Sequence, residues 1–392
     1  MPAPLEGILV LDLSRVLAGP FCTMLLSDLG ARVIKVELPA EGDVTRGWGP
    51  PYDPATGLSA YYLSVNRNKE SIAIDLRSEE GLESIRRIAR RADVLVENFA
   101  PGALEKLGLS LPELRQANPR LVTASITGFG RRGPDASAPG FDLLAQAGAG
   151  MMAITGTAQG EPTKVGVAVS DIFAGCYAAI AILAALFARE RTGKGTHVET
   201  DLFSATVASL INVAQSALVT GEEGGRYGNA HPQIVPYRSF SASDGPFVLA
   251  CGTDRQFARL ADLVGRPQWR EDARYRANAG RVEHRKTLES ELQDIFRGQM
   301  RQAWLARFSA AGIPAGPVRG PLEALQSETA RALELVRETG GIGFVASPLR
   351  LEGHTPPLRP PPQLDEDGEK LRKEFGLPAT AGRKTEDGRR ET

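Results

Sequence analysis

Apolar and polar positions alternate along the first two hundred residues as short apolar runs separated by longer amphipathic segments. The apolar runs predict strands, and the segments between them carry apolar residues at helical spacing. The predicted strands are residues 7–13, 31–36, 71–75, 94–97 and 121–127, and the predicted helices are 18–29, 79–90 and 112–118. Strands that alternate with helices are typical of a parallel sheet covered by helices, so we expect an α/β fold with a Rossmann-like large domain.

The pattern changes in the second half of the chain. Two apolar segments predict long helices at 175–189 and 198–218, and a cluster of charge and glycine follows at 220–227. Beyond the cluster, the chain predicts a smaller α+β domain. Its predicted elements are a strand at 246–251 and helices at 254–263, 281–297 and 302–310.

These patterns divide the chain into domains. Residues 1–220 form the first part of a large domain and residues 221–325 a small domain. Residues 326–378 return to the large domain through strand candidates at 342–344 and 349–351. Residues 379–392 are rich in charge and have no apolar period, which predicts a disordered tail.

The composition of the chain argues against several classes of partner and site. The 46 basic and 47 acidic residues leave almost no net charge, which argues against a nucleic-acid partner. The start of the chain has no basic-then-apolar leader, and the apolar run 178–187 is too short to cross a bilayer, so we expect a cytoplasmic protein without a membrane partner. Three cysteines in apolar surroundings and four scattered histidines predict neither disulfides nor a metal site.

A single carboxylate, Asp171, marks the most informative stretch. The apolar residues 164–169 read as a strand, and the small apolar residues 172–179 read as the start of a helix. Asp171 is therefore either the N-cap of a buried helix or a reagent, and the two roles are compatible. A helix N-terminus should keep this carboxylate ionised, which suits a nucleophile. Residues 15–20 lack the Gly-x-Gly-x-x-Gly turn of nicotinamide-binding folds.

Six segments carry a family resemblance in their order and spacing. They are 7–20, 29–37, 42–48, 66–71, 92–102 and 125–130. Together they resemble the family III CoA-transferases, which include formyl-CoA transferase and the related alpha-methylacyl-CoA racemases. The resemblance extends over all but about the last twenty residues.

The resemblance implies a structure and a chemistry. Members of the family are homodimers in which two ring-shaped chains interlock, so an interlocked homodimer is expected. The implied activity moves CoA from an acyl-CoA to a free carboxylic acid, with CoA as co-substrate and no permanently bound cofactor. By similarity the nucleophile is Asp171, which forms an aspartyl anhydride and then an aspartyl-CoA thioester.

The same resemblance assigns CoA contacts. The matching positions are Val16, Lys69, Asn98, Phe99, Lys106 and Leu107. Lys69, Lys106 and Arg46 are candidates to offset phosphate charge, and Phe99 offers an aromatic face. Leu38 departs from the family pattern, since formyl-CoA transferase has an arginine there.

A substrate loop is expected at 228–238. The residues singled out in it are Gly228, Asn229, His231, Tyr237 and Arg238. Its sequence pattern is most similar to that of succinate-hydroxymethylglutarate CoA-transferases. This similarity favours a dicarboxylate substrate such as succinate, with His231 and Arg238 as carboxylate partners. The alternative interpretation is a polar connector between domains.

Two other functions stay open at this point. A racemase needs an acid/base pair at the alpha carbon, but Phe141 stands where racemases carry a histidine, and a phenyl ring cannot take a proton. A non-catalytic acyl-CoA binding protein would keep the CoA face without needing Asp171.

Overall fold

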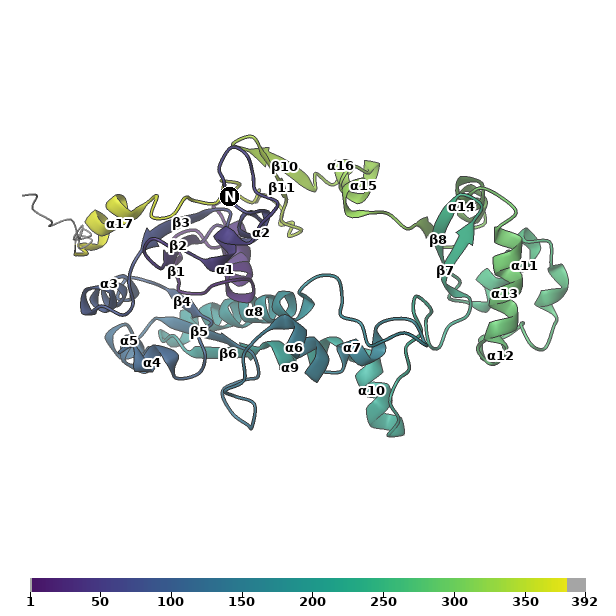
Figure 1. Cartoon of the computed structure of the whole chain (residues 1–392), viewed down its shortest axis with the longest axis horizontal. Coiled ribbons are helices and arrows are strands. Elements are labelled where there is room, and N and C mark those ends of the chain that lie inside the picture. The colour runs from purple at the N-terminus through teal and green to yellow at the C-terminus, as the bar shows by residue number, and fades with distance from the viewer. Residues whose placement is uncertain (1, 379–392) are drawn as a thin grey trace, which may run out of the picture. The chain divides into compact units, whose positions relative to one another are not determined.

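The computed structural model describes residues 2–378 (Figure 1). The chain forms two compact units, each with its own core. The described residues of unit 1 are 2–151, 165–220 and 331–378, and unit 2 comprises 152–164 and 221–330. Unit 1 is interrupted after residue 220 and resumes at residue 331. The tail predicted at 379–392 lies outside the described residues.

Residues 152–164, expected in the large domain, belong to unit 2. Arg226 explains this placement, because its guanidinium donates to three carbonyl oxygens of that segment, at 3.4 Å to Ala153, 3.2 Å to Thr157 and 2.7 Å to Gly160. The cluster at 220–227, which the sequence indicated as a domain boundary, therefore contains Arg226, the residue that links the two segments of unit 2.

Unit 1 is built on a six-stranded parallel sheet with the order β3-β2-β1-β4-β5-β6. The strands are β1 (Leu9–Asp12), β2 (Arg32–Glu37), β3 (Lys69–Ala73), β4 (Val94–Glu97), β5 (Val122–Thr127) and β6 (His197–Asp201). The chain first builds outward from β1 to β3 and then continues on the other side of β1 with β4. Ligands of such sheets bind at this reversal, beyond the carboxyl ends of the strands.

Helices cover both faces of the sheet, as the alternation of side chains along each strand requires. Val10, Val94 and Val96 pack against α1 (Ala18–Asp28) and α8 (Val169–Thr192). Leu11 and Leu95 face the opposite side. That side is covered by α3 (Glu79–Ala89), α4 (Ala103–Lys106), α5 (Leu111–Ala117) and α17 (Gly368–Phe375). The α/β class and the parallel sheet predicted from the apolar pattern are confirmed.

The predicted helix at 198–218 is wrong in its first turn. Residues His197–Asp201 form β6, which pairs with Thr123–Thr127 of β5. The Asp201 side chain then accepts the Ser204 N–H at 2.7 Å and starts α9 (Leu202–Ser209), which is followed by α10 (Ile211–Thr220). A free edge on β5 and a capping aspartate together override the helical pattern.

Helix α8 also differs from its prediction. It has 24 residues and begins at Val169, and the strand expected at 164–169 is not formed. The apolar run judged too short for a bilayer is part of this longer helix, so the argument from length does not hold. By length and composition α8, and the bent pair α9 and α10, could cross a membrane, a test that buried core helices also pass.

Unit 2 is an antiparallel sheet with helices. Its strands are β7 (Tyr237–Ala242), β8 (Gly245–Ala250) and β9 (Ala315–Pro317), and its main helices are α11 (Asp254–Leu263), α12 (Asn278–Glu283), α13 (Arg285–Phe296) and α14 (Arg301–Ala310). The helix predicted at 281–297 is thus split at His284. An aromatic cluster forms the core, in which Phe296 lies edge-on to Phe247 at 5.2 Å and to Trp304 at 5.1 Å.

The C-terminal return forms a hairpin and a covering helix on unit 1. Strand β10 (Val336–Thr339) pairs with β11 (Ile342–Val345), whereas the strand predicted at 349–351 is only one isolated bridge between Leu351 and His354. The remaining elements are η1 (Val44–Gly47), α2 (Ala60–Val65), α6 (Asp142–Gly148), α7 (Met151–Ile154), η2 (Pro267–Arg270), α15 (Pro321–Leu325) and α16 (Glu328–Ala332).

Candidate active site at the carboxyl ends of the parallel strands

Asp171 lies in the first turn of α8, three residues after the N-cap Ala168, so of the two roles considered for it the N-cap role is not observed. The side chain instead meets the backbone N–H of Ala18, at the start of α1. Gly175, one turn further along α8, permits this approach, because an added Cβ there would lie 2.7 Å from the Ala18 carbonyl oxygen. A glycine in one helix thereby brings a carboxylate of that helix to the N-terminus of another.

The pKa of Asp171 is raised to about 7, mainly by burial and next by the charge of Asp142, while the Ala18 N–H lowers it. Burial disfavours the charged form, and a like charge nearby adds to the effect. The sequence led us to expect that a helix N-terminus keeps this carboxylate ionised; a pKa of about 7 leaves it only partly ionised at neutral pH. Asp171 is only partly buried as a residue.

Asp142 and Gln146 hold the segment that leads into α8. Asp142 Oδ1 accepts the Ser170 N–H at 2.9 Å, and its other oxygen accepts from Gln146 Nε2 at 2.7 Å. Gln146 Oε1 in turn accepts the Val165 N–H at 2.8 Å. The sequence pointed to Asp142 only through the comparison with racemases. Its hydrogen bonds fix the start of α8, and its charge raises the pKa of Asp171.

Tyr61 of α2 is a further neighbour that the sequence did not indicate. Burial raises the pKa of its phenol to about 12, followed by the charges of Asp171 and Asp142. The phenol therefore stays protonated and can act as a hydrogen-bond donor near the carboxylates.

A cleft of about 270 Å³ opens beyond the ends of β1, β2, β3 and β4, at the reversal of the strand order. Phe99 and Leu107, two of the positions matched to CoA contacts, line it together with Leu38. Arg15 and Arg77 also line it, and they follow β1 and β3 in the sequence. Their position shortly after the carboxyl ends of two strands of the same sheet is the signal that could have identified them.

The turn after β1 joins this cleft to Asp171. Asn98 binds both backbone groups of Arg15, accepting its N–H at 2.8 Å and donating to its carbonyl at 2.7 Å. Val16 follows with φ at +69°, and Ala18 then meets Asp171. Three residues span at most ~11 Å, so the cleft and the carboxylate lie at the two ends of one short segment.

The phosphate role expected of Lys69 does not fit its position. Its side chain is fully buried, and its Nζ donates to Asp12 at 3.1 Å, to Pro20 O at 2.9 Å and to Asn66 at 3.0 Å. Burial lowers its pKa to about 8 despite the neighbouring Asp12. Lys69 stabilises the sheet and the start of α1.

Arg46 is occupied in the same way, since it forms a bidentate pair with Glu37 at 2.8 and 2.7 Å. Lys106 is exposed at the end of α4, next to Leu107 of the cleft. Of the three predicted cations, Lys106 is the one whose residue is exposed to solvent.

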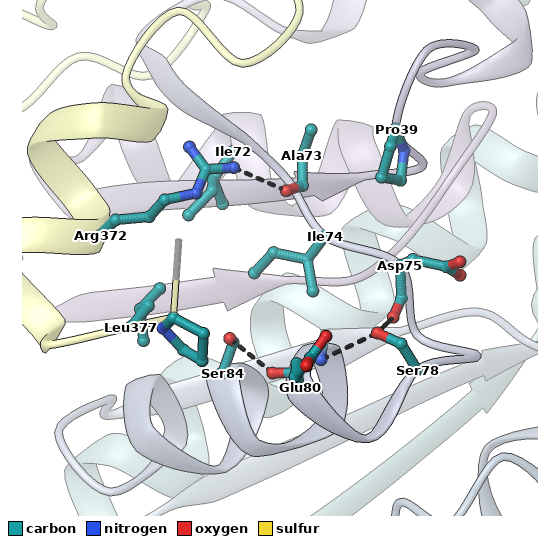
Figure 2. A pocket seen from close by; sticks show the side chains of 12 residues that line it. Pro39, Ile72, Ala73, Ile74, Asp75, Ser78, Glu80, Ser84, Arg372 and Leu377 are labelled. Atoms are coloured by element: carbon teal, nitrogen blue, oxygen red, sulfur yellow. Dashed lines mark hydrogen bonds between the residues drawn. The ribbon is translucent and has the colours of Figure 1, made fainter. Parts of the chain in front are cut away.

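A neighbouring cavity of about 280 Å³ lies between β3, α3 and α17 (Figure 2). Its polar groups bind one another. Arg372 donates to Ala73 O at 3.0 Å, and Ser78 Oγ donates to Asp75 O at 2.9 Å. Because these donors are already taken, the cavity fits a packing gap beside the sheet edge better than a phosphate site.

In unit 2, the predicted substrate loop is a tight, hydrogen-bonded turn. Asn229 Nδ2 donates to Ser239 Oγ at 3.0 Å, and the His231 N–H donates to Tyr237 O at 2.9 Å. Gly228 supports the turn with φ at +59°.

Arg238, expected to bind a substrate carboxylate, is paired with Glu289 at 2.7 Å. His231 differs, because its Nδ1 accepts the Gln233 N–H at 3.0 Å and leaves Nε2 without a hydrogen-bond partner among the described residues. In the neutral ring the proton then lies on Nε2, which can donate to an acceptor.

No group of three or more histidine, cysteine, aspartate or glutamate side chains within residues 2–378 is arranged to hold a metal ion. The expectation that the protein works without one stays a prediction.

Comparison with known proteins decides the family. The pattern of CoA-transferase family III matches residues 5–368. The chain belongs to this family. It is 40% identical to acetyl-CoA:oxalate CoA-transferase of Acetobacter aceti, over 96% of each chain, and 40% identical to succinate–glutarate CoA-transferase of Agrobacterium fabrum, over 93% of each. A crystal structure of a CaiB/BaiF family protein from Brucella suis superposes with a TM-score of 0.88 at 42% identity, covering 96% of this chain and all of that one.

Proposed function

We propose that this family III CoA-transferase transfers CoA through covalent intermediates on Asp171. The observation that carries the proposal is the position of Asp171: a half-buried carboxylate of raised pKa at the N-terminus of α1, joined by one short turn to the cleft at the sheet reversal. A more basic carboxylate is a better nucleophile once it is ionised.

The proposed steps need no added acid or oxidant. The Asp171 carboxylate attacks the thioester carbon of the donor, the C–S bond breaks, and CoA thiolate leaves an aspartyl–acyl anhydride. The thiolate then attacks the Asp171 carbonyl carbon and releases the donor acid, which leaves aspartyl-CoA. The acceptor carboxylate attacks that thioester and expels the thiolate. The thiolate finally attacks the acceptor acyl carbon, which forms the new acyl-CoA and frees Asp171.

The nucleotide end of CoA fits the cleft that Phe99, Leu107 and Leu38 line. Arg15 and Arg77 at the cleft, with the exposed Lys106 beside Leu107, supply positive charge for phosphates. The turn from Arg15 to Ala18 then leads the pantetheine arm toward Asp171.

The names of the relatives support a dicarboxylic acid as acceptor. Two of them are an oxalate and a glutarate CoA-transferase. We propose that His231 meets the second carboxylate of such an acid, because its Nε2–H is the donor that the loop leaves available.

We also propose that the protein is a homodimer. Unit 1 has an apolar cavity of about 520 Å³ between α1, α8 and residues 345–349, and exposed apolar side chains on α8, among them Ile180 at 61% and Phe187 at 69%. A second copy of the chain is the occupant that the family resemblance indicates, and interlocking comes from that resemblance alone. Sedimentation should show a dimer, and Phe187→Glu should shift it toward monomer.

A cytoplasmic location remains part of the proposal. Cys22, Cys176 and Cys251 are free thiols, which suits a reducing compartment. Cell fractionation tests this directly, and recovery in the membrane fraction would contradict it.

Racemisation is not favoured. Phe141 has no proton to exchange, and Asp142 is occupied by Ser170 and Gln146. Deuterium wash-in at the alpha carbon of a branched acyl-CoA would reveal such an activity.

The function is tested with a panel of acyl-CoA donors and free acids, read by mass spectrometry. Wild-type protein should exchange CoA and form an adduct on the peptide that contains Asp171, whereas Asp171→Ala should bind CoA without turnover. Turnover by that variant at the wild-type rate would refute the mechanism.

A further inference from the structure

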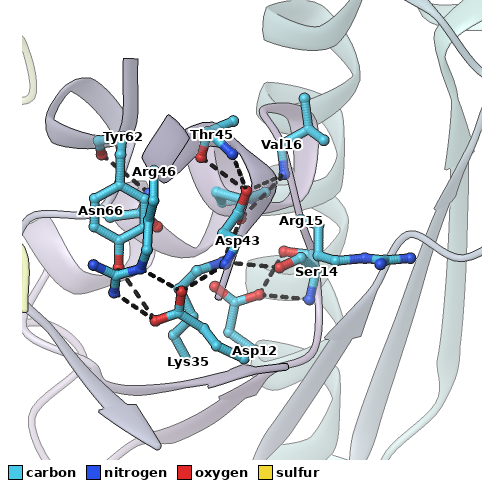
Figure 3. Close-up of polar contacts among 12 residues, drawn as sticks. Asp12, Ser14, Arg15, Val16, Lys35, Asp43, Thr45, Arg46, Tyr62 and Asn66 are labelled. Carbon is cyan, nitrogen blue, oxygen red and sulfur yellow. Dashed lines mark hydrogen bonds and ion pairs between the residues drawn. The ribbon is translucent and has the colours of Figure 1, made fainter. Parts of the chain in front are cut away.

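The turn that leads from β1 into α1 is fixed by side chains from several segments (Figure 3). Asp12 Oδ1 accepts the Ser14 N–H at 3.0 Å, and Lys35 Nζ donates to the Ser14 carbonyl at 3.0 Å. Asp43 accepts the Val16 N–H at 3.2 Å, and Asn98 binds both backbone groups of Arg15. Each polar backbone group from Ser14 N to Val16 N therefore has a side-chain partner.

Val16 needs such a partner more than its neighbours do. Its φ of +69° lies in the left-handed region, which β-branched residues rarely adopt. Strained conformations of this kind persist only where the surroundings fix them, and they concentrate at functional sites. Two residues later, the Ala18 N–H meets Asp171.

Asp43 is itself held rigidly. It is buried, its Oδ2 accepts from Lys35 Nζ at 2.9 Å, and its Oδ1 accepts the Thr45 N–H at 3.0 Å. Its own N–H donates to Glu37 at 2.9 Å. Burial, the largest influence, opposes ionisation of Asp43, but Lys35 and Thr45 together outweigh it and hold its pKa below the ordinary value.

We propose that Asp43, fixed by Lys35, is a positioning residue for the transfer reaction: by binding the Val16 N–H it holds the strained turn that aims the Ala18 N–H at Asp171. The inference rests on the proposed role of Asp171. Asp43 touches neither the nucleophile nor the reacting atoms in this scheme, and it acts through the backbone of three residues.

The readout is the pH dependence of kcat/KM, which depends on the groups around Asp171. Asp142 of α6 and Tyr61 of α2 face it, and α1 contributes the Ala18 N–H. That N–H lowers the pKa of Asp171. If the turn loosens, the N–H should move away, the pKa of Asp171 should rise, and the acid limb of kcat/KM should move to higher pH. A loss of stability alone would not move this limb.

The test compares Asp43→Asn with Asp28→Asn. Asp28 is the last residue of the same helix α1, is also buried, and pairs with Arg67 at 2.5 Å. D43N should lower kcat by about 10- to 100-fold, as expected for a misplaced catalytic group, and shift the acid limb upward. D28N should lower the melting temperature but keep kcat within about twofold and the limb unmoved.

A rescue sharpens the test. Glycine adopts φ near +69° without steric cost, so Val16→Gly in the D43N background should recover part of kcat. Asp43→Glu keeps the charge but displaces the carboxylate, and it serves if D43N does not fold. An acid limb unmoved in the folded variant, or no recovery by V16G, would overturn the proposal.

Failure of the proposed function would be visible separately. If folded wild-type protein transfers CoA to no acid in the panel, the function is wrong and the role of Asp43 is judged by amide hydrogen exchange. Faster exchange at residues 16–18 in D43N than in D28N would still support a positioning turn, and equal rates would contradict it.

Discussion

The two units each contain a short segment fixed by side chains, but different types of side chain hold the backbone in each. In unit 1, oxygens of Asp12, Asp43 and Asn98 accept N–H groups of the turn at 14–16. In unit 2, Arg281 and Arg285 donate to carbonyl oxygens of the loop at 231–235. Lys35 and the Asn98 amide also donate to carbonyls of the unit 1 turn, so that turn is held at both its N–H and its C=O groups. The arginines of unit 2 hold their loop at carbonyls.

The two segments also differ in the hydrogen-bonding group that each offers to another group. The unit 1 turn ends at the N-terminus of α1, where an amide meets the carboxylate of Asp171. The unit 2 loop has its carbonyls occupied, and it leaves the His231 ring with a donor at Nε2. The first segment suits a reaction that needs accurate placement, and the second suits recognition of an anionic group.

The largest effect is expected where unit 2 depends on one buried cation. Arg281 donates to Val235 O at 2.6 Å, to Tyr275 O at 2.8 Å and to Asp254 at 2.7 Å. Arg281→Met leaves two carbonyls unpaired, each costing about 1–3 kcal/mol, so unit 2 should lose ~3 kcal/mol of stability. Denaturant titrations followed by fluorescence of the buried Trp269 and Trp304 measure this.

The matched control is Arg270→Met, whose pair with Asp262 leaves the two side chains 50% and 49% exposed. Its loss should cost about 0–1 kcal/mol. Equal effects of the two substitutions would mean that the loop does not depend on Arg281.

A smaller effect is expected for Asp142→Asn in unit 1. Asp171 must be ionised to attack, and its pKa is raised to about 7, so wild-type kcat/KM should fall as pH drops through 7. Removing the Asp142 charge should move that limb to lower pH by only about one pH unit, because burial, the larger cause of the raised pKa of Asp171, remains. Below the limb, the variant should then hold about tenfold more ionised Asp171 than wild type at the same pH.

Asp201→Asn is the control, since Asp201 also caps a helix in unit 1 by accepting the Ser204 N–H. It should leave the limb in place. A limb that stays near pH 7 in D142N would restrict Asp142 to holding the start of α8.

The sequence predicted the scaffold better than the pairing of charges. The strand at 94–97 and the helix at 79–90 were identified almost to the residue, because alternation and capping are local. Lys69 was assigned to phosphate, although in the fold it is buried against Asp12, a residue 57 positions away. Asp171 was found by motif, whereas its raised pKa depends on Asp142 and on burial, which no local pattern records.

The smallest effect is expected on KM for the acceptor acid, and it distinguishes His231 from Arg238 as the residue that binds the acid. If His231 Nε2 binds the second carboxylate, His231→Ala should raise KM for a dicarboxylic acceptor about tenfold, the value of one charge-assisted hydrogen bond, and leave KM for a monocarboxylic acid nearly constant. His231→Gln keeps an amide donor and should lie between. Arg238→Met should raise KM less than H231A, because Glu289 already takes its guanidinium at 2.7 Å. A larger rise with Arg238→Met would show that this ion pair opens to the substrate, and that the unit 2 loop reads the acid with a full charge.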